Sequence, residues 1–126
     1  MRLKFLIKEA KYNLRKRIQR FKHGYSDEDV WNMDTWFVET IIPMLHQLKT
    51  RGIGTPAYLT EDEWHDILDQ MLNHLYFMNE DNVVKFLGLY PYPTTTEDYK
   101  RINEILLDHK NKFFELFSKY FYDLWD

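Results

Sequence analysis

The feature that constrains this chain most is a helix start followed by an acidic residue at a position where an apolar one is expected. Ser26 and Asp29 have the spacing of a capping box, and Asp27 and Glu28 add negative charge where the helix dipole favours it. The pattern predicts a helix that begins at Asp27. At about 100° per residue, Asp34 then falls inside an apolar arc, where a carboxylate needs a partner. The arc consists of Val30, Met33, Phe37, Ile41, Leu45 and Leu48.

Helical periodicity over most of the chain predicts an all-α fold, a compact bundle of four main helices. The first helix is expected over residues 3–22, with Gly24 as its stop. The second is expected over 27–50, kinked or split at Pro43, because proline removes a backbone donor and clashes with the preceding turn. We expect the first helix to pack back onto the rest of the chain through an apolar stripe, because large apolar side chains gain free energy when they leave water. The stripe consists of Leu3, Ile7, Ala10, Leu14, Ile18 and Phe21.

The second half of the chain predicts two further long helices. A capping box of Thr60 and Glu63 opens a helix that reaches about residue 79, and a short helical turn is expected at 83–89. The last helix is expected over 95–124. Because its apolar positions cover more than half of its circumference, we expect it to be largely buried, either inside the bundle or against a second copy in a homodimer.

Length and composition favour one helical domain. A chain of 126 residues with 44% hydrophobic residues has material for one core. It has no cysteine, which fits a reducing compartment, and no apolar run approaches the roughly 20 residues that span a bilayer. The basic start also lacks the features of a signal peptide. These observations predict a cytoplasmic protein with no membrane contact.

Charge divides the domain into a basic amphipathic helix, 1–22, and an acidic helical body, 26–126. The first part has nine Lys and Arg residues against Glu9 alone, whereas the rest has eight basic and nineteen acidic residues. Such asymmetry is typical either of a nucleic-acid contact or of a basic helix fitted to an acidic body. The candidate nucleic-acid residues are Lys4, Lys8, Lys11, Arg15, Lys16 and Arg20.

Motifs of common enzymes are absent from the sequence. There is no HExxH, no paired-carboxylate motif and no glycine-rich phosphate loop, so the sequence favours a non-enzymatic protein without deciding the point. No cofactor and no metal site are predicted. The weaker alternative is a metal-dependent hydrolase, in which Glu39 and His46 share one helix face and meet Glu63 or Asp66 of another helix.

Asp34 has two candidate partners in the last helix. His109 and Lys110 face or border its aromatic arc, so either can form a buried pair that fixes the helix register. The alternative is a polar pocket between the second and last helices that holds a small anion or nucleotide. Its predicted ligand-binding residues are Asp34, Trp31, Trp36, Tyr99, His109 and Lys110, with Phe113 as a further wall.

Four segments carry a resemblance to a known group of proteins. They are RFKHGYSDEDVWNMD at 20–34, IPML at 42–45, LTEDEW at 59–64 and LFSKYFYDLWD at 116–126. Together they resemble a group of small proteins encoded by tailed bacteriophages, a group without an assigned activity. The resemblance implies a viral protein that works in the cytoplasm of a bacterial host, and it transfers no catalytic residue.

The sequence thus leaves functions of different classes open. The first is a bacteriophage accessory protein that binds a host component and counteracts host defence, through a defence protein or its nucleotide signal. The second is a nucleic-acid binder that uses the basic helix. The third, less favoured, is the metal-dependent hydrolase around Glu39 and His46.

Overall fold

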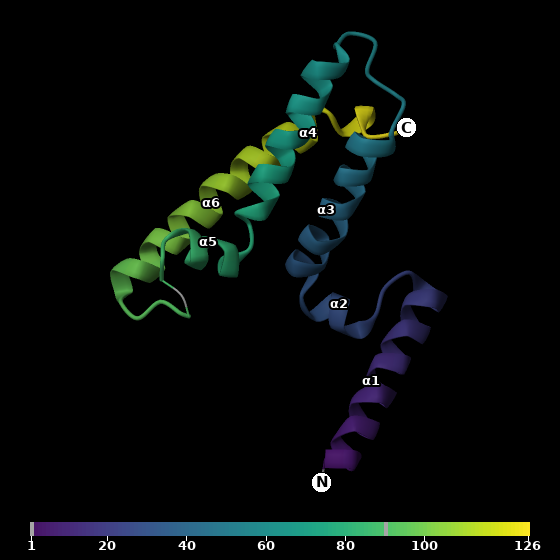
Figure 1. Ribbon diagram of the computed structural model, residues 1–126, viewed down its shortest axis with the longest axis vertical. Helices are drawn as coiled ribbons and strands as arrows, with labels where there is room; N and C mark the ends of the chain where they lie inside the picture. The colour runs from purple at the N-terminus through teal and green to yellow at the C-terminus, as the bar shows by residue number, and fades with distance from the viewer. Residues whose placement is uncertain (1, 90) are drawn as a thin grey trace. The chain divides into compact units, whose positions relative to one another are not determined.

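The computed structural model describes residues 2–89 and 91–126 and confirms the all-α prediction. The described residues form six α-helices and one short 3-10 helix, and no strand occurs among them. Figure 1 labels the α-helices along the chain. In order, the elements are α1 (Arg2–His23), α2 (Asp27–Trp31), α3 (Met33–Arg51), α4 (Glu61–Tyr76), α5 (Glu80–Phe86), α6 (Thr96–Lys119) and η1 (Phe121–Asp123).

The chain forms two compact units, the first ending at Phe37 and the second running from Val38 to Asp126. The first unit contains α1, α2 and the first turn of α3. The change of charge at residues 22–26, from the basic helix to the acidic body, lies inside the first unit. The reason is that α2, although acidic, packs against α1.

The prediction of one helix over residues 27–50 is wrong, because this segment forms two helices, α2 and α3. Asn32 separates α2 from α3 with φ −132° and ψ 58°, outside the helical region. Pro43, where a kink or split was expected, lies inside α3 and does not end it. The break at Asn32 shifts the helical register, so Asp34 does not belong to one continuous apolar arc. It lies exposed in the first turn of α3, where its carboxylate accepts the backbone N–H of Thr35 at 2.9 Å.

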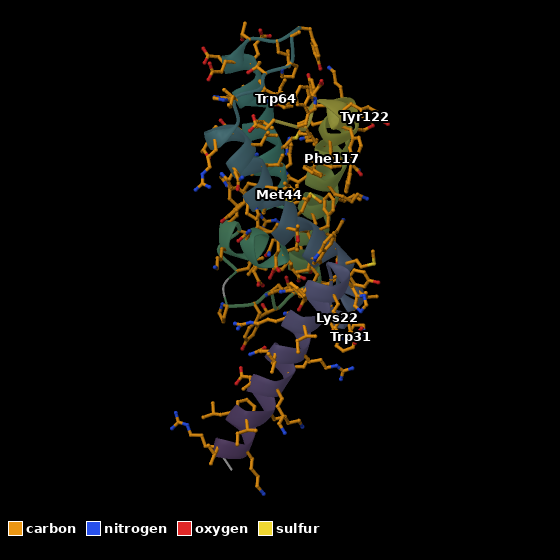
Figure 2. All side chains as sticks on the ribbon, turned by 90° about the vertical axis from the view of Figure 1, so that its right-hand side faces the viewer. Lys22, Trp31, Met44, Trp64, Phe117 and Tyr122 are labelled. Atoms are coloured by element: carbon orange, nitrogen blue, oxygen red, sulfur yellow. The ribbon has the colours of Figure 1, made fainter. Side chains whose placement is uncertain are left out.

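In the second unit, α6 packs along α4 and α5, as the green and teal ribbons of Figure 1 show. Trp64 of α4, labelled in Figure 2, is buried and meets the ring of Tyr120 edge-on at 5.9 Å. A smaller cluster joins Val83 and Val84 of α5 to Ile102 of α6. These contacts form most of the apolar core between α6 and the two helices before it, and α3 adds the buried Val38 and Leu45.

The prediction that the last helix is largely buried is wrong. Only Ile102 and Phe113 of α6 are buried, whereas Tyr99, Leu107 and Phe114 remain about half exposed, between 43% and 54%. The physical reason is that α4 and α5 cover one side of α6. Its other aromatic positions lie at the surface of the unit, and homodimerisation through them stays a prediction.

The loop between α3 and α4 is fixed by the last residues of the chain. The Asp126 carboxylate accepts the backbone N–H groups of Ile53 and Gly54 at 2.6 and 3.2 Å. The hydroxyl of Tyr58 donates to the Asp123 carboxylate, which raises the pKa of Tyr58 to about 12. Among residues 2–89 and 91–126, no helix combines the length and apolar character needed to cross a membrane.

Candidate functional site

The acidic first turn of α2 binds the polar face of α1. The predicted capping box is present: Ser26 Oγ accepts the Asp29 N–H, and the Asp29 carboxylate accepts the Ser26 N–H at 2.8 Å. The same carboxylate accepts two hydrogen bonds from Arg20, at 2.7 and 3.0 Å. The Arg20 guanidinium and the Ser26 contacts hold the pKa of Asp29 well below its usual range, although burial opposes them. Asp29 is therefore a buried ionised acid whose partner belongs to the preceding helix.

The two neighbouring acids of α2 also bind α1. Glu28 accepts from Lys16 at 2.7 Å and from the hydroxyl of Tyr12 at 2.8 Å, and the Lys16 contact is the main reason why the pKa of Glu28 is lowered. Gln19 donates to the Asp27 carboxylate and accepts the Asp27 backbone N–H, at 2.8 and 3.0 Å. Three consecutive acids thus form what we call the α1–α2 clamp, with Tyr12, Lys16, Gln19 and Arg20 as their partners.

The clamp divides the predicted nucleic-acid residues into two groups. Arg15, Lys16 and Arg20 face acids of α2, with Arg15 3.8 Å from Asp27. Lys4, Lys8 and Lys11 lie nearer the N-terminus, are exposed and form no ion pair among the described residues. Within the first unit, the first half of α1 therefore carries exposed cations that no acid of α2 pairs.

The apolar stripe of α1 lies on the face opposite to the clamp. At 100° per residue, Lys16 is 200° from Leu14 and 200° from Ile18, so binding of α2 leaves the stripe uncovered. No residue of α1 is buried, and Leu14, Ile18 and Phe21 are 58%, 46% and 91% exposed. A free helix face of this kind is typical of a surface that binds another molecule.

A shallow, open hollow flanks this face along the C-terminal half of α1 and extends to Gln19 of the clamp. Leu14 and Ile18 supply its apolar lining, and Lys11 and Lys22 supply positive charge that no acid of α2 pairs. Figure 2 labels Lys22 at the end of α1. An apolar surface bordered by cations fits an acidic partner that presents apolar side chains.

Trp31 lines a different and smaller hollow of about 140 Å³, between α1 and α2. The side chains of the clamp, including Lys16 and Glu28, form its other walls. This volume is below the roughly 300–1,000 Å³ of ligand pockets, and its charges are already paired. The hollow does not provide the space that a nucleotide needs.

The residues of the predicted anion or nucleotide pocket belong to different units. Trp31, Asp34 and Trp36 lie in the first unit, and Tyr99, His109 and Lys110 in the second. Within the second unit, His109 hydrogen-bonds another imidazole and Lys110 is exposed, and the pairing of Asp34 with either residue stays a prediction. Tyr99 is half exposed, and its hydroxyl donates to the Pro93 carbonyl at 3.5 Å. The pocket itself stays a prediction.

The actual partner of His109 is His74, near the end of α4. Their Nδ1 atoms are 2.9 Å apart, and the ring of Phe77 stacks on His109 at 4.8 Å. Both rings are partly buried, and this desolvation is the main reason why the pKa of each imidazole is lowered. An Nδ1 to Nδ1 hydrogen bond requires one ring to donate and the other to accept, so at least one of the two imidazoles is neutral.

Sequence reasoning missed this pair, although a signal for it exists. His74 lies seven residues after the buried Ile67, and His109 lies seven residues after the buried Ile102. Residues seven apart share a helix face, so both imidazoles border the core faces of their helices. The sequence does not reveal that α4 and α6 pack with these two positions opposite each other.

The proposed hydrolase ligands are not brought into a cluster. Glu39, His46, Glu63 and Asp66 are all exposed. No group of three or more His, Cys, Asp or Glu side chains that could hold a metal ion occurs in the part of the chain that the structure describes.

Comparisons of the chain with family models, with curated proteins and with solved structures find no match in any of the three. The resemblance to the tailed-bacteriophage group therefore stays a prediction.

Proposed function

We propose that this chain is a non-enzymatic bacteriophage accessory protein that binds a host protein through the exposed face of α1. The observation that carries the proposal is the apolar stripe, which lies opposite the clamp and has no cover in the first unit. The clamp uses only polar side chains of α1, so it holds the helix while leaving the stripe free for a partner.

The charge and shape of the stripe favour one class of partner. Burying Leu14 and Ile18 would contribute roughly 1.5–3 kcal/mol each if they became fully covered. Lys11 and Lys22 border the same hollow and favour an acidic rim. An apolar groove with acidic edges, which accepts amphipathic helices in many complexes, has both properties. A defence protein of the host with such a groove is the partner that we propose.

Affinity capture from a bacterial lysate, with mass spectrometry of proteins and of small molecules in the eluate, tests this proposal. The informative variant is Leu14→Gln with Ile18→Gln, which keeps the helix and its charge. We expect the amount of captured protein to fall at least tenfold, because each lost apolar contact weakens binding by a factor of that order. Unchanged capture by this variant would overturn the proposal.

Phe5→Gln is the matched control. Phe5 is 65% exposed on α1 but lies 180° from Leu14 on the helical wheel, outside the stripe. It removes an exposed apolar side chain of the same helix without touching the proposed surface. Capture that fails equally in this control and in the double variant would indicate damage to α1 rather than loss of a specific contact.

Nucleic acid is the second candidate, and the unpaired lysines near the N-terminus favour it. If phosphates bind Lys4, Lys8 and Lys11, affinity for duplex DNA falls steeply with salt, and each phosphate contact contributes close to one unit to the log–log slope. Changing these three lysines to glutamine should then reduce the slope by nearly three units. The control changes Lys85, Lys100 and Arg101 to glutamine, which alters net charge equally in the second unit.

A further inference from the structure

The His74–His109 pair lies where three helices of the second unit meet. His74 belongs to the last turn of α4, and His109 lies in α6. Phe77, the C-cap residue that follows α4, stacks on His109 and meets Phe86 of α5 edge-on at 5.2 Å. Phe77 also packs against the cluster of Val83, Val84 and Ile102. The pair is therefore connected through one aromatic ring to the packing of α5.

We propose that this pair makes the contact between α4 and α6 sensitive to pH, closed while the imidazoles share one Nδ1 proton and opened when both carry a full charge. In the neutral pair, one ring donates its Nδ1–H to the Nδ1 lone pair of the other. A first added proton can bind the free Nε2 of the donor ring and keep this hydrogen bond. A second proton must occupy the accepting Nδ1, which removes the hydrogen bond and places two like charges in contact.

The surroundings of the pair do not compensate two positive charges. Asp108 favours the charged form of both imidazoles, but it forms an ion pair with Lys112 at 2.9 Å. Lys112 in turn disfavours a charge on either ring. The contacts from the ends of α4 and α5 are the aromatic rings of Phe77 and Phe86, which carry no charge. Burial is the largest effect on both rings and acts against protonation.

The sign of the pH effect follows from the lowered pKa values. The unfolded chain binds protons at the ordinary histidine pKa of about 6.5, whereas the folded pair binds them only at lower pH. Stability from the pair is complete above about pH 6.5 and decreases as the pH falls through the lowered values. Within that window, the unfolding equilibrium constant rises by up to about tenfold per pH unit for each excess proton that the unfolded state binds.

Two measurements on the full chain test the proposal. Titration of the imidazole signals by NMR should show His74 and His109 both ionising below the ordinary value, as two coupled steps. Urea unfolding, followed through amide signals of α4 and α6, should show a loss of stability between pH 7.5 and 5.5. Titration of both rings at an ordinary pKa would overturn the proposal even if no variant folds.

Variants separate the pair from the other histidines. His109→Asn keeps a polar atom near the position of Nδ1 but does not titrate, so the stability loss between pH 7.5 and 5.5 should shrink. His46→Asn is the control, because it removes an exposed imidazole from the same unit without touching the pair. An equal pH dependence in the His109→Asn variant and the unaltered chain would show that the pair does not sense pH.

Discussion

The interactions that stabilise the first unit internally differ in kind from those that stabilise the second. In the first unit, the buried residues are Ser26 and Asp29, both polar, and the large apolar side chains of α1 are exposed. In the second unit, the buried set is apolar and includes Trp64, Leu68 and Phe113. The first unit thus depends on hydrogen bonds and ion pairs in defined geometry, and the second on the removal of apolar surface from water. The comparison shows that the apolar residues of α1 are not used to hold its own unit together.

The largest expected effect is the loss of a core ring from the second unit. Phe113 is fully buried and contacts the rings of Phe114 and Phe117 at 5.1 and 5.2 Å. Replacing a buried phenylalanine with alanine removes its transfer energy and leaves a cavity, so Phe113→Ala should cost about 3–5 kcal/mol. Urea unfolding, monitored separately for the two units by NMR, measures this cost.

The matched control is the same substitution in the first unit. Phe21 is 91% exposed, so Phe21→Ala should change stability by no more than about 0.5 kcal/mol. A cost above 2 kcal/mol for Phe21→Ala would break the comparison, because it would mean that the stripe is part of a core.

A smaller loss of stability is expected when the pH is lowered, and the pH range in which it occurs should differ between the two units. The pKa of Asp29 is lowered mainly by Arg20, and that of Glu28 mainly by Lys16. Their unfolded values are about 3.9 and 4.3, so the clamp contributes full stability above about pH 4 and loses it as the pH falls through the lowered values. Amide signals of α1 and α2 should therefore persist at pH 5, where the second unit has already lost stability.

Arg20→Gln sharpens this acid experiment. The variant removes the guanidinium that lowers the pKa of Asp29, so less stability should be lost between pH 4 and pH 2. If α1 and α2 separate before the second unit weakens, the assignment of the two pH windows is wrong.

Local rules predicted the helix ends of this chain better than the contacts between helices. The capping boxes at Ser26 and Thr60 and the stop at Gly24, which adopts φ +81°, are all present, because each depends on a few adjacent residues. The break at Asn32 was missed because asparagine is compatible with a helix and the apolar spacing continues past it. Pro43 was expected to kink or split the helix, and it does not split it, because α3 continues through it.

The candidate sites were predictable only where they depend on one helix. The amphipathic character of α1 follows from its sequence, but the expected packing of its stripe onto the rest of the chain is not found within the first unit, where these side chains are exposed. The clamp was not predicted, because it requires the turn at Gly24 to place the acids of α2 beside the cations of α1. The contact of His109 with His74 was missed for the same reason, because helical wheels give the face of a residue but not the helix that packs against it.

The smallest expected effect concerns Asp34, the residue to which the sequence pointed most strongly. In the structure it is exposed and accepts one hydrogen bond from the neighbouring Thr35 N–H. Asp34→Asn keeps that acceptor and loses only a favourable charge in the first turn of α3, so stability should change by no more than about 0.5 kcal/mol. A loss of 3–5 kcal/mol would instead indicate that Asp34 is half of a buried pair, as the sequence first suggested. Because the variant should remain folded, capture of the host partner can be measured on the same sample. Normal stability with lost capture would place Asp34 in a binding site, whereas normal values of both would show that it only faces water.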